Sequence, residues 1–205
     1  QDSITQVTPL VAEGIMYLHS ANTMFALNAS TGEELWRRPL DSGRAGGPVR
    51  GSTYASGRIY AYRGADLYAF DAETGEEIRS FGETGVVQVI TDALNFKYPD
   101  VYPDNTDPIN LGYRLTTPPT VHNGKMYVAA ALSEGHIPGG LVIRIDALSG
   151  AVEWVFNTVP QTPSDSGWEI ARDTWGTGQR AGGGVWTPPA IDTEFGLVYV
   201  NAGNP

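Results

Sequence analysis

Several residues of this 205-residue chain that could bind a ligand or a metal ion lie next to or close to glycines. Glu134 lies within residues 133–140, a glycine-rich stretch that interrupts an apolar strand pattern. Its carboxylate is the kind of oxygen donor that a hard cation prefers. Trp186 follows the glycine run 182–184, which leaves room for a flat ring to approach the backbone and the indole face. Taken alone, Glu134 is more simply explained as an exposed loop carboxylate.

Arg50 and Asn204 also carry groups that could bind a ligand. Arg50 stands before a glycine, where it is either a ligand contact or a surface arginine that stabilises a turn. Asn204 precedes Pro205, a combination that is typical of turns. Neither residue by itself indicates a function.

Two further patterns point to no chemistry. The histidines His19, His122 and His136 have no metal-ligand spacing, and we expect them at the surface, with His136 close enough to Glu134 to border a site. The run 176–178 superficially matches a dinucleotide-binding fingerprint, but no strand precedes it and the following prolines prevent a helix.

A repeat with the period of a propeller blade organises the chain. Each copy contains short runs of alternating apolar and polar residues, then an Asx or Thr-Gly turn, then a strand that ends on an aromatic residue in the first and third copies. Tyr17 and Tyr60 are 43 residues apart, as are Asn28 and Asp71. This length is typical of a four-stranded blade, and a β-solenoid is the less favoured alternative.

We therefore predict an all-β fold, a partial β-propeller of four-stranded antiparallel blades with about three blades and the start of a fourth. A small sheet with an apolar face buries it by stacking on the next sheet, and a radial stack leaves only short protected edges. The predicted domain covers residues 1–205, with units at about 1–48, 49–115, 116–185 and 186–205. Three units cannot close a ring, so we expect the rest of the propeller chain as a partner.

Insertions between the units are expected to build the binding surface. Residues 82–115 and 157–185 are polar and too long for hairpin loops, and residues 133–140 lengthen the third unit. Insertions of this kind cluster on one face of a propeller.

Composition excludes several classes of function. Thirteen basic residues against twenty-three acidic ones argue against a nucleic-acid partner. The absence of cysteine excludes disulfides and thiolate metal sites. No apolar run is long enough for a transmembrane helix.

The repeat at residues 26–36, and in weaker form at 144–154, resembles the tryptophan-docking repeat of quinoprotein dehydrogenases. These enzymes are eight-bladed propellers that carry pyrroloquinoline quinone (PQQ). Thr116-Thr117-Pro118-Pro119, the Gly182–Trp186 run and Gly203-Asn204-Pro205 resemble the alcohol and methanol dehydrogenase branch in order and spacing. Where that branch often has adjacent cysteines before the arginine, this chain has Arg44 and Ala45, so the resemblance is to the cofactor class rather than to methanol dehydrogenase itself.

The resemblance implies a set of site residues. It makes Glu134 and Asn204 metal ligands, with Ca²⁺ or a lanthanide as the metal, and Trp186 the floor under the cofactor. The cofactor-binding residues it implies are Arg50, Thr116, Glu134, Gly183, Gly184 and Trp186. The catalytic base, an aspartate in this family, is expected beyond Pro205, so no catalytic residue is assigned.

The implied function is a PQQ-dependent dehydrogenase that oxidises an alcohol or sugar-type substrate by hydride transfer to a metal-polarised quinone. The expected electron acceptor is a cytochrome c or a quinone, and the expected location is the periplasm. The alternative is a non-catalytic propeller scaffold for protein–protein interaction, of the outer-membrane assembly type. Convergence of Glu134, Arg50, Trp186 and Asn204 on one pocket would favour the enzyme.

Overall fold

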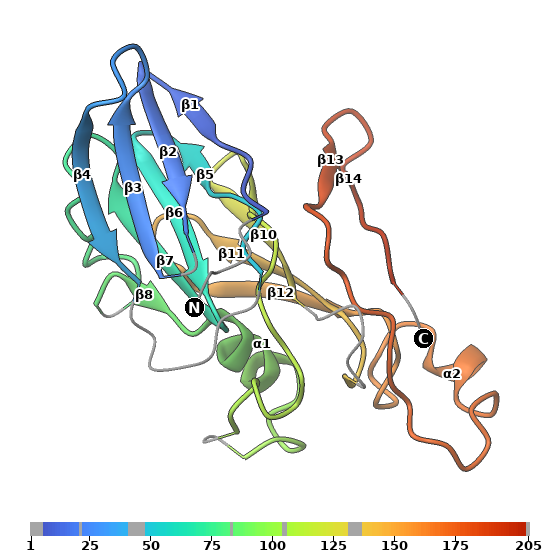
Figure 1. Cartoon of the computed structure of the whole chain (residues 1–205). Helices are drawn as coiled ribbons and strands as arrows, with labels where there is room; N and C mark the ends of the chain where they lie inside the picture. Colours follow the sequence, from blue (N-terminus) through green and yellow to red (C-terminus); the bar gives the residue numbers. More distant parts are fainter. Residues whose placement is uncertain are drawn as a thin grey trace.

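The computed structural model describes residues 6–20, 22–40, 48–82, 84–103, 106–130 and 137–203, and its sheets are all antiparallel (Figure 1). Blade 1 contains β1 (Leu10–Ala12), β2 (Ile15–His19), β3 (Thr23–Asn28) and β4 (Glu34–Pro39). Blade 2 contains β5 (Thr53–Ala55), β6 (Arg58–Arg63), β7 (Asp66–Asp71) and β8 (Val86–Val87). Blade 3 contains β9 (Thr120–His122), β10 (Lys125–Ala130), β11 (Leu141–Asp146) and β12 (Val152–Asn157). The described part of blade 4 contains β13 (Ala190–Asp192) and β14 (Leu197–Tyr199).

The first strand of each blade lies on the inside of a ring. Within blades 1 to 3 the strands follow one another in sequence order across the sheet, and contacts between blades join β1 to β5, β5 to β9 and β9 to β13. These four strands therefore line a common axis, and β4, β8 and β12 lie outermost. The predicted partial β-propeller of about three blades and the start of a fourth is confirmed.

The burial of each strand follows from how many of its faces are covered. Strands β6 and β7 in blade 2 are buried at nearly every position, because blades 1 and 3 cover both faces of this sheet. Strand β2 in blade 1 alternates between buried and half-buried residues instead. One covered face produces the period-two pattern, and two covered faces produce a continuous apolar run.

Blade 1 docks onto the third hairpin turn of blade 2 through a tyrosine and a tryptophan. The Tyr17 hydroxyl and the Trp36 Nε1–H both donate to the Ala72 carbonyl, at 3.0 and 3.1 Å. The indole of Trp36 lies against Gly75, where an added Cβ would come within 2.6 Å of ring atom Cδ2. The Thr-Gly turn therefore provides both the positive φ and the space that the docked indole requires.

Blade 2 docks onto blade 3 with different side chains. The sequence has Arg79 where the first and third units have tryptophan, and this arginine is exposed. Phe81 and Val87 fill the place instead, since an added Cβ on Gly150 would lie 2.3 Å from Val87 Cγ2 and 3.3 Å from Phe81 Cε2. Blades 2 and 3 are therefore joined by the apolar side chains of Phe81 and Val87 in place of an indole.

Trp154, the aromatic residue that ends the strand of the third copy, is 40% exposed. Its ring stacks on Phe156 at 6.3 Å and borders a cavity of about 200 Å³ together with Val198 and Val200 from blade 4. No turn equivalent to the one that covers Trp36 lies over it within the described residues.

Two short helices belong to the insertions. Helix α1 (Val89–Lys97) follows β8 inside the insertion 82–115 and buries Val89, Ile90, Ala93 and Leu94 in the core. Helix α2 (Trp168–Ala171) lies in the second insertion, and both helices are at the end of the molecule where β4 finishes (Figure 1). None of the helices in the described ranges is long and apolar enough to cross a bilayer.

Candidate functional site at the propeller axis

The connections that enter the inner strands converge on a cleft at the axis. Each runs from an outer strand to the next inner strand, and Arg50, Thr116 and Trp186 stand just before β5, β9 and β13. The cleft has a volume of about 370 Å³. This axial cleft is lined by Thr8, Pro9, Leu10, Arg50, Gly51, Ser52, Thr117, Pro118 and Pro188, from all four blades.

Arg50 is the charged residue of the axial cleft. Its Nη1 donates to the Thr116 carbonyl at 3.1 Å, and its guanidinium carbon lies 5.6 Å from the centre of the Trp186 ring. A guanidinium at this distance over an indole makes a cation–π contact. The structure thus brings together three residues that are 66 and 70 positions apart in the sequence.

Trp186 keeps part of its indole open beside this arginine. Its side chain is 39% exposed, and Gly203 packs at its edge, where an added Cβ would lie 2.8 Å from Nε1. The Gly203 N–H donates to the Gly184 carbonyl at 2.7 Å, next to a bridge between Val185 and Ala202. This backbone pairing holds the segment that carries the indole.

Gly183 packs against blade 3, since an added Cβ on Gly183 would lie 2.7 Å from Thr158 Oγ1. The predicted approach of a cofactor ring to Gly183 and Gly184 stays a prediction. The Gly183 φ of +63° also favours glycine. Gly183 is therefore required by packing against Thr158, whereas the glycine that lies against the indole is Gly203.

Two hydroxyls at the axial cleft have no hydrogen-bond partner among the described residues. These are Ser52 Oγ and Thr117 Oγ1, in side chains that are 8% and 1% exposed. Buried hydroxyls are nearly always paired in folded proteins, and orphaned ones commonly mark a site where a ligand or water binds. Neither hydroxyl was predicted from the sequence, which pointed to Thr116, whose carbonyl accepts from Arg50. Only their positions beside Arg50 and Thr116 could have indicated them.

His19 is buried, so the prediction that all three histidines lie at the surface is wrong. Its side chain is 1% exposed, in β2 behind the axial cleft, and Nδ1 lies 3.1 Å from the Gly51 carbonyl. Burial lowers the pKa of His19 to about 4, although the hydrogen bond to the Gly51 carbonyl opposes this shift. The ring is therefore neutral at pH 7.

The two predicted metal ligands, Glu134 and Asn204, lie outside the described residues. Within the described ranges, no group of three or more His, Cys, Asp or Glu side chains is arranged to hold a metal ion. The predicted metal site thus stays a prediction.

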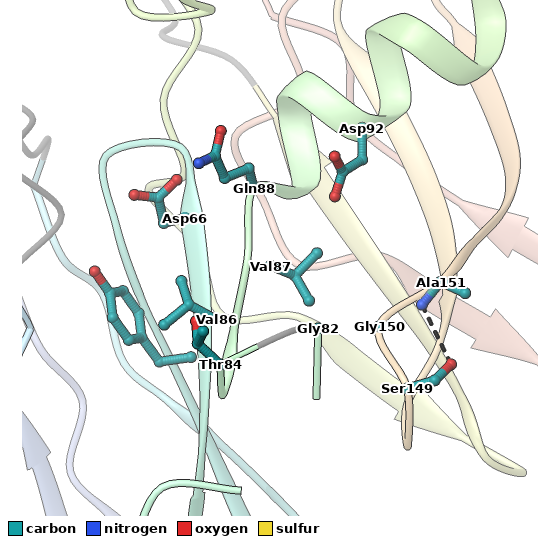
Figure 2. Close-up of a pocket in the computed structure, with 11 residues that line it drawn as sticks. Asp66, Gly82, Thr84, Val86, Val87, Gln88, Asp92, Ser149, Gly150 and Ala151 are labelled. Atoms are coloured by element: carbon teal, nitrogen blue, oxygen red, sulfur yellow. Dashed lines mark hydrogen bonds between the residues drawn. The ribbon is translucent and has the colours of Figure 1, made fainter. Parts of the chain in front are cut away.

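A larger cleft of about 670 Å³ lies at the seam between blades 2 and 3 (Figure 2). Asp66, Gln88 and Asp92 lie toward one end of it, and Ser149 and its neighbours in the blade 3 turn lie at the other. Its described lining contains no arginine, and none of the predicted site residues that the structure describes belongs to it. We therefore place the candidate site at the smaller axial cleft.

A family model described as the β-propeller domain of glucose, ethanol and alcohol dehydrogenases, labelled PQQ, matches residues 1–205. The chain belongs to this family. The axial cleft is thus part of a PQQ-dehydrogenase propeller.

Relatives of this PQQ-dehydrogenase propeller cover nearly all of it. The quinohemoprotein alcohol dehydrogenase ADH-IIG of Pseudomonas putida is 30% identical over 99% of the chain, and its solved structure superposes with a TM-score of 0.74 at 28% identity, covering 99% of this chain and 29% of that one. The dehydrogenase subunit of the quinone-dependent alcohol dehydrogenase of Komagataeibacter europaeus is also 30% identical, over 96% of the chain. The chain spans 27% of the length of each of these two relatives.

Proposed function

We propose that the chain forms part of a PQQ-dependent dehydrogenase that oxidises an alcohol or sugar-type substrate. The observation that carries the proposal is the axial cleft itself. Arg50 lines this cleft, and its guanidinium stands over the partly exposed indole of Trp186. The unpartnered hydroxyls of Ser52 and Thr117 belong to residues that line the same cleft.

These residues fit the chemistry of the cofactor. PQQ is flat and carries carboxylates and quinone oxygens, so it needs an aromatic surface and hydrogen-bond donors. Trp186 supplies the surface, and Arg50 supplies a charged donor with fork geometry. Among the described residues that line the axial cleft there is no carboxylate, and Arg50 provides a positive charge for an anionic ligand.

Each residue has a separate role in this proposal. Arg50 binds oxygens of the cofactor and stabilises negative charge that develops on them, and Thr117 and Ser52 donate further hydrogen bonds. Trp186 fixes the plane of the ring system. Glu134 and Asn204 are the proposed ligands of Ca²⁺ or a lanthanide, which suits a carboxylate and an amide oxygen. When bound, PQQ supplies the two-electron acceptor for the substrate hydride, and the protein orients and polarises it.

The proposal extends to partners and location. We propose a cytochrome c or a quinone as electron acceptor and the periplasm as compartment, on the strength of the family resemblance. Relatives named as quinohemoproteins support the acceptor part of the proposal. Separation of periplasmic and cytoplasmic fractions, followed by detection of the protein, tests the compartment.

Reconstitution tests the proposed function. The full-length protein is incubated with PQQ and either Ca²⁺ or a lanthanide, and dye-linked oxidation is measured over a panel of primary alcohols, aromatic alcohols and sugars. We expect PQQ uptake and turnover in the wild type, and uptake weakened at least about tenfold by Arg50→Gln, because a charged hydrogen bond is lost. Arg79→Gln, which changes an exposed arginine of the same blade, is the matched control and should not alter uptake. A wild type that takes up no PQQ under either metal would contradict the proposal.

A further inference from the structure

The backbone around Arg50 is held by hydrogen bonds at three successive peptide groups. The Arg50 N–H donates to the Tyr62 hydroxyl at 3.0 Å, and the Arg50 carbonyl accepts from the Thr8 N–H at 3.2 Å. The Gly51 carbonyl lies 3.1 Å from His19 Nδ1. Arg50 is thus fixed by side chains from blades 1 and 2 before its guanidinium reaches Thr116 and Trp186.

His19 and Tyr62 form one unit behind this backbone. Their rings meet edge to face, with centroids 5.0 Å apart and an interplanar angle of 78°. Both side chains are about 1% exposed. They occupy equivalent places in β2 and β6, 43 residues apart like Tyr17 and Tyr60, so the blade repeat itself aligns them side by side.

The hydrogen-bond partner fixes the role of the His19 ring. A carbonyl oxygen only accepts, so Nδ1 carries the proton and donates to Gly51. Nε2 then carries a lone pair and has no partner among the described residues. The orientation of this buried ring therefore depends on its hydrogen bond to the Gly51 carbonyl.

Gly51 is the residue through which His19 restrains the backbone of Arg50. Its φ of +150° disfavours any other residue, and the ideal Cβ position lies 3.5 Å from the Thr8 carbonyl oxygen, in ordinary contact. Glycine is conformationally free, so the backbone next to Arg50 needs contacts from other residues to hold it. The hydrogen bonds of Tyr62 to the Arg50 N–H and of His19 to the Gly51 carbonyl provide these contacts.

We propose that His19 and Tyr62 are positioning residues: through the Arg50–Gly51 backbone they hold the Arg50 guanidinium in place at Trp186 for the cofactor. The inference rests on the proposed function, since the ligand that Arg50 receives is PQQ. The competing explanation is that the two side chains only join blades 1 and 2.

A double-mutant cycle separates these explanations. His19→Leu removes the donor at similar volume, His19→Asn keeps an N–H near the same place, and Tyr62→Phe removes only the hydroxyl. Tyr60→Phe is the matched control, because the buried Tyr60 hydroxyl donates to the Ala147 carbonyl of the next blade at 2.7 Å without contacting Arg50. Each variant of the full-length protein is made with Arg50 and with Arg50→Gln, and the dissociation constant of PQQ in the presence of Ca²⁺ is measured by equilibrium ultrafiltration.

We expect His19→Leu and Tyr62→Phe to weaken PQQ binding about tenfold with Arg50 present and less than about twofold with Arg50→Gln. His19→Asn should recover binding to within about threefold of wild type, and Tyr60→Phe should change the thermal midpoint but not the affinity. Equal losses in both backgrounds, or no loss in either, would overturn the inference. If His19→Leu does not fold, Tyr62→Phe decides the question by the same comparison.

The failures of the two proposals are distinguishable. A wild type that binds PQQ, with affinity unchanged in His19→Leu and Tyr62→Phe, overturns the positioning role and leaves the proposed function intact. A wild type that binds no PQQ overturns both.

Discussion

At the scale of single residues, the axial cleft combines polar groups that have hydrogen-bond partners in the protein with hydroxyls that have none among the described residues. Arg50 contacts residues of every blade, through Thr8, Tyr62, Thr116 and Trp186. The hydroxyl of Thr117, next to one of these partners, has none among the described residues. A buried hydroxyl without a hydrogen-bond partner carries a desolvation cost that no protein group offsets. A ligand that bonds to this hydroxyl would offset the cost.

Replacing Thr117 should therefore have opposite effects on stability and on binding. Thr117→Val removes an unpartnered buried hydroxyl, so the free energy of unfolding without cofactor should stay equal or rise by up to about 1 kcal/mol. PQQ affinity should fall by about three- to tenfold, the value of one hydrogen bond. Thermal unfolding and equilibrium ultrafiltration measure the two quantities.

Thr120→Val is the matched control. The Thr120 hydroxyl donates to the Pro189 carbonyl at 2.6 Å, between β9 and the segment before β13. Its loss should lower the free energy of unfolding by about 1 kcal/mol. Equal destabilisation by both substitutions would show that the Thr117 hydroxyl is paired in the protein after all.

At the scale of elements, the blades are joined by docking onto glycine-containing turns. Gly32 and Gly75 occupy the same position in the third hairpin turns of blades 1 and 2, with φ of +76° and +69°. An added Cβ on Gly32 meets nothing within 4 Å, whereas on Gly75 it would lie 2.6 Å from Trp36. The two positions differ in packing and not in backbone conformation.

This pair isolates the energy of tryptophan docking. Gly32→Ala should lower the free energy of unfolding by about 1–2 kcal/mol, because alanine disfavours positive φ. Gly75→Ala should lower it by about 2 kcal/mol more, since the indole has to move. Thermal midpoints of both variants check the difference, and equal midpoints would mean that the indole relaxes freely.

The two helical insertions are joined by a buried ion pair. Lys97, at the end of α1, lies 2.6 Å from Asp165, whose side chain is 1% exposed. The Asp165 carboxylate also accepts from the Tyr98 hydroxyl and from the N–H groups of Gln161 and Thr162. Burial acts to raise the pKa of Asp165, but Lys97 and the N–H donors outweigh it and hold the pKa below its ordinary value.

Asp165→Asn should therefore destabilise the protein in a pH-dependent way. A carboxyl whose pKa is depressed by folding stabilises fully above its unfolded pKa of about 3.9, and this contribution is lost as the pH falls through the lower folded value. We expect a loss of about 3 kcal/mol at pH 7 that shrinks below about pH 4. Thermal unfolding of the wild type and the variant from about pH 3 to about pH 8 measures this loss of stability.

Asp100→Asn is the control for this series, because Asp100 is exposed and near α1. Its effect should be small at every pH. A destabilisation by Asp165→Asn that does not change with pH would argue against a role for the charge.

At the scale of the whole molecule, the axial cleft belongs to no single blade. Its lining comes from the segments before β1, β5, β9 and β13, so a ligand bound there contacts the whole set of inner strands. Binding to the folded state alone raises stability by mass action.

PQQ with Ca²⁺ should accordingly raise the unfolding midpoint of the full-length protein. At a free concentration one hundred times the dissociation constant, the gain is about 2.7 kcal/mol. The gain should be much smaller for Arg50→Gln and unchanged for Arg79→Gln. Fluorescence-monitored thermal unfolding over a PQQ titration measures it, and a shift of equal size in Arg50→Gln would place the cofactor elsewhere.

The repeat, its turns and the blade architecture could all be predicted from the sequence. Alternation of apolar residues and Asx or Thr-Gly turns are local properties, so they can be recognised within one unit. The position of Arg50, Thr116 and Trp186, just before successive inner strands, follows from the same repeat.

Which side chains each blade presents to the next could be seen only in the assembled fold. His19 is buried and not at the surface, Phe81 and Val87 replace the docked tryptophan, Thr117 provides the unpartnered hydroxyl, and α1 forms inside an insertion. Each of these depends on contacts between residues that the repeat separates by tens of positions. Equivalent positions such as His19 and Tyr62 carry different side chains and meet different neighbours, and a local pattern holds no information about the neighbouring blade.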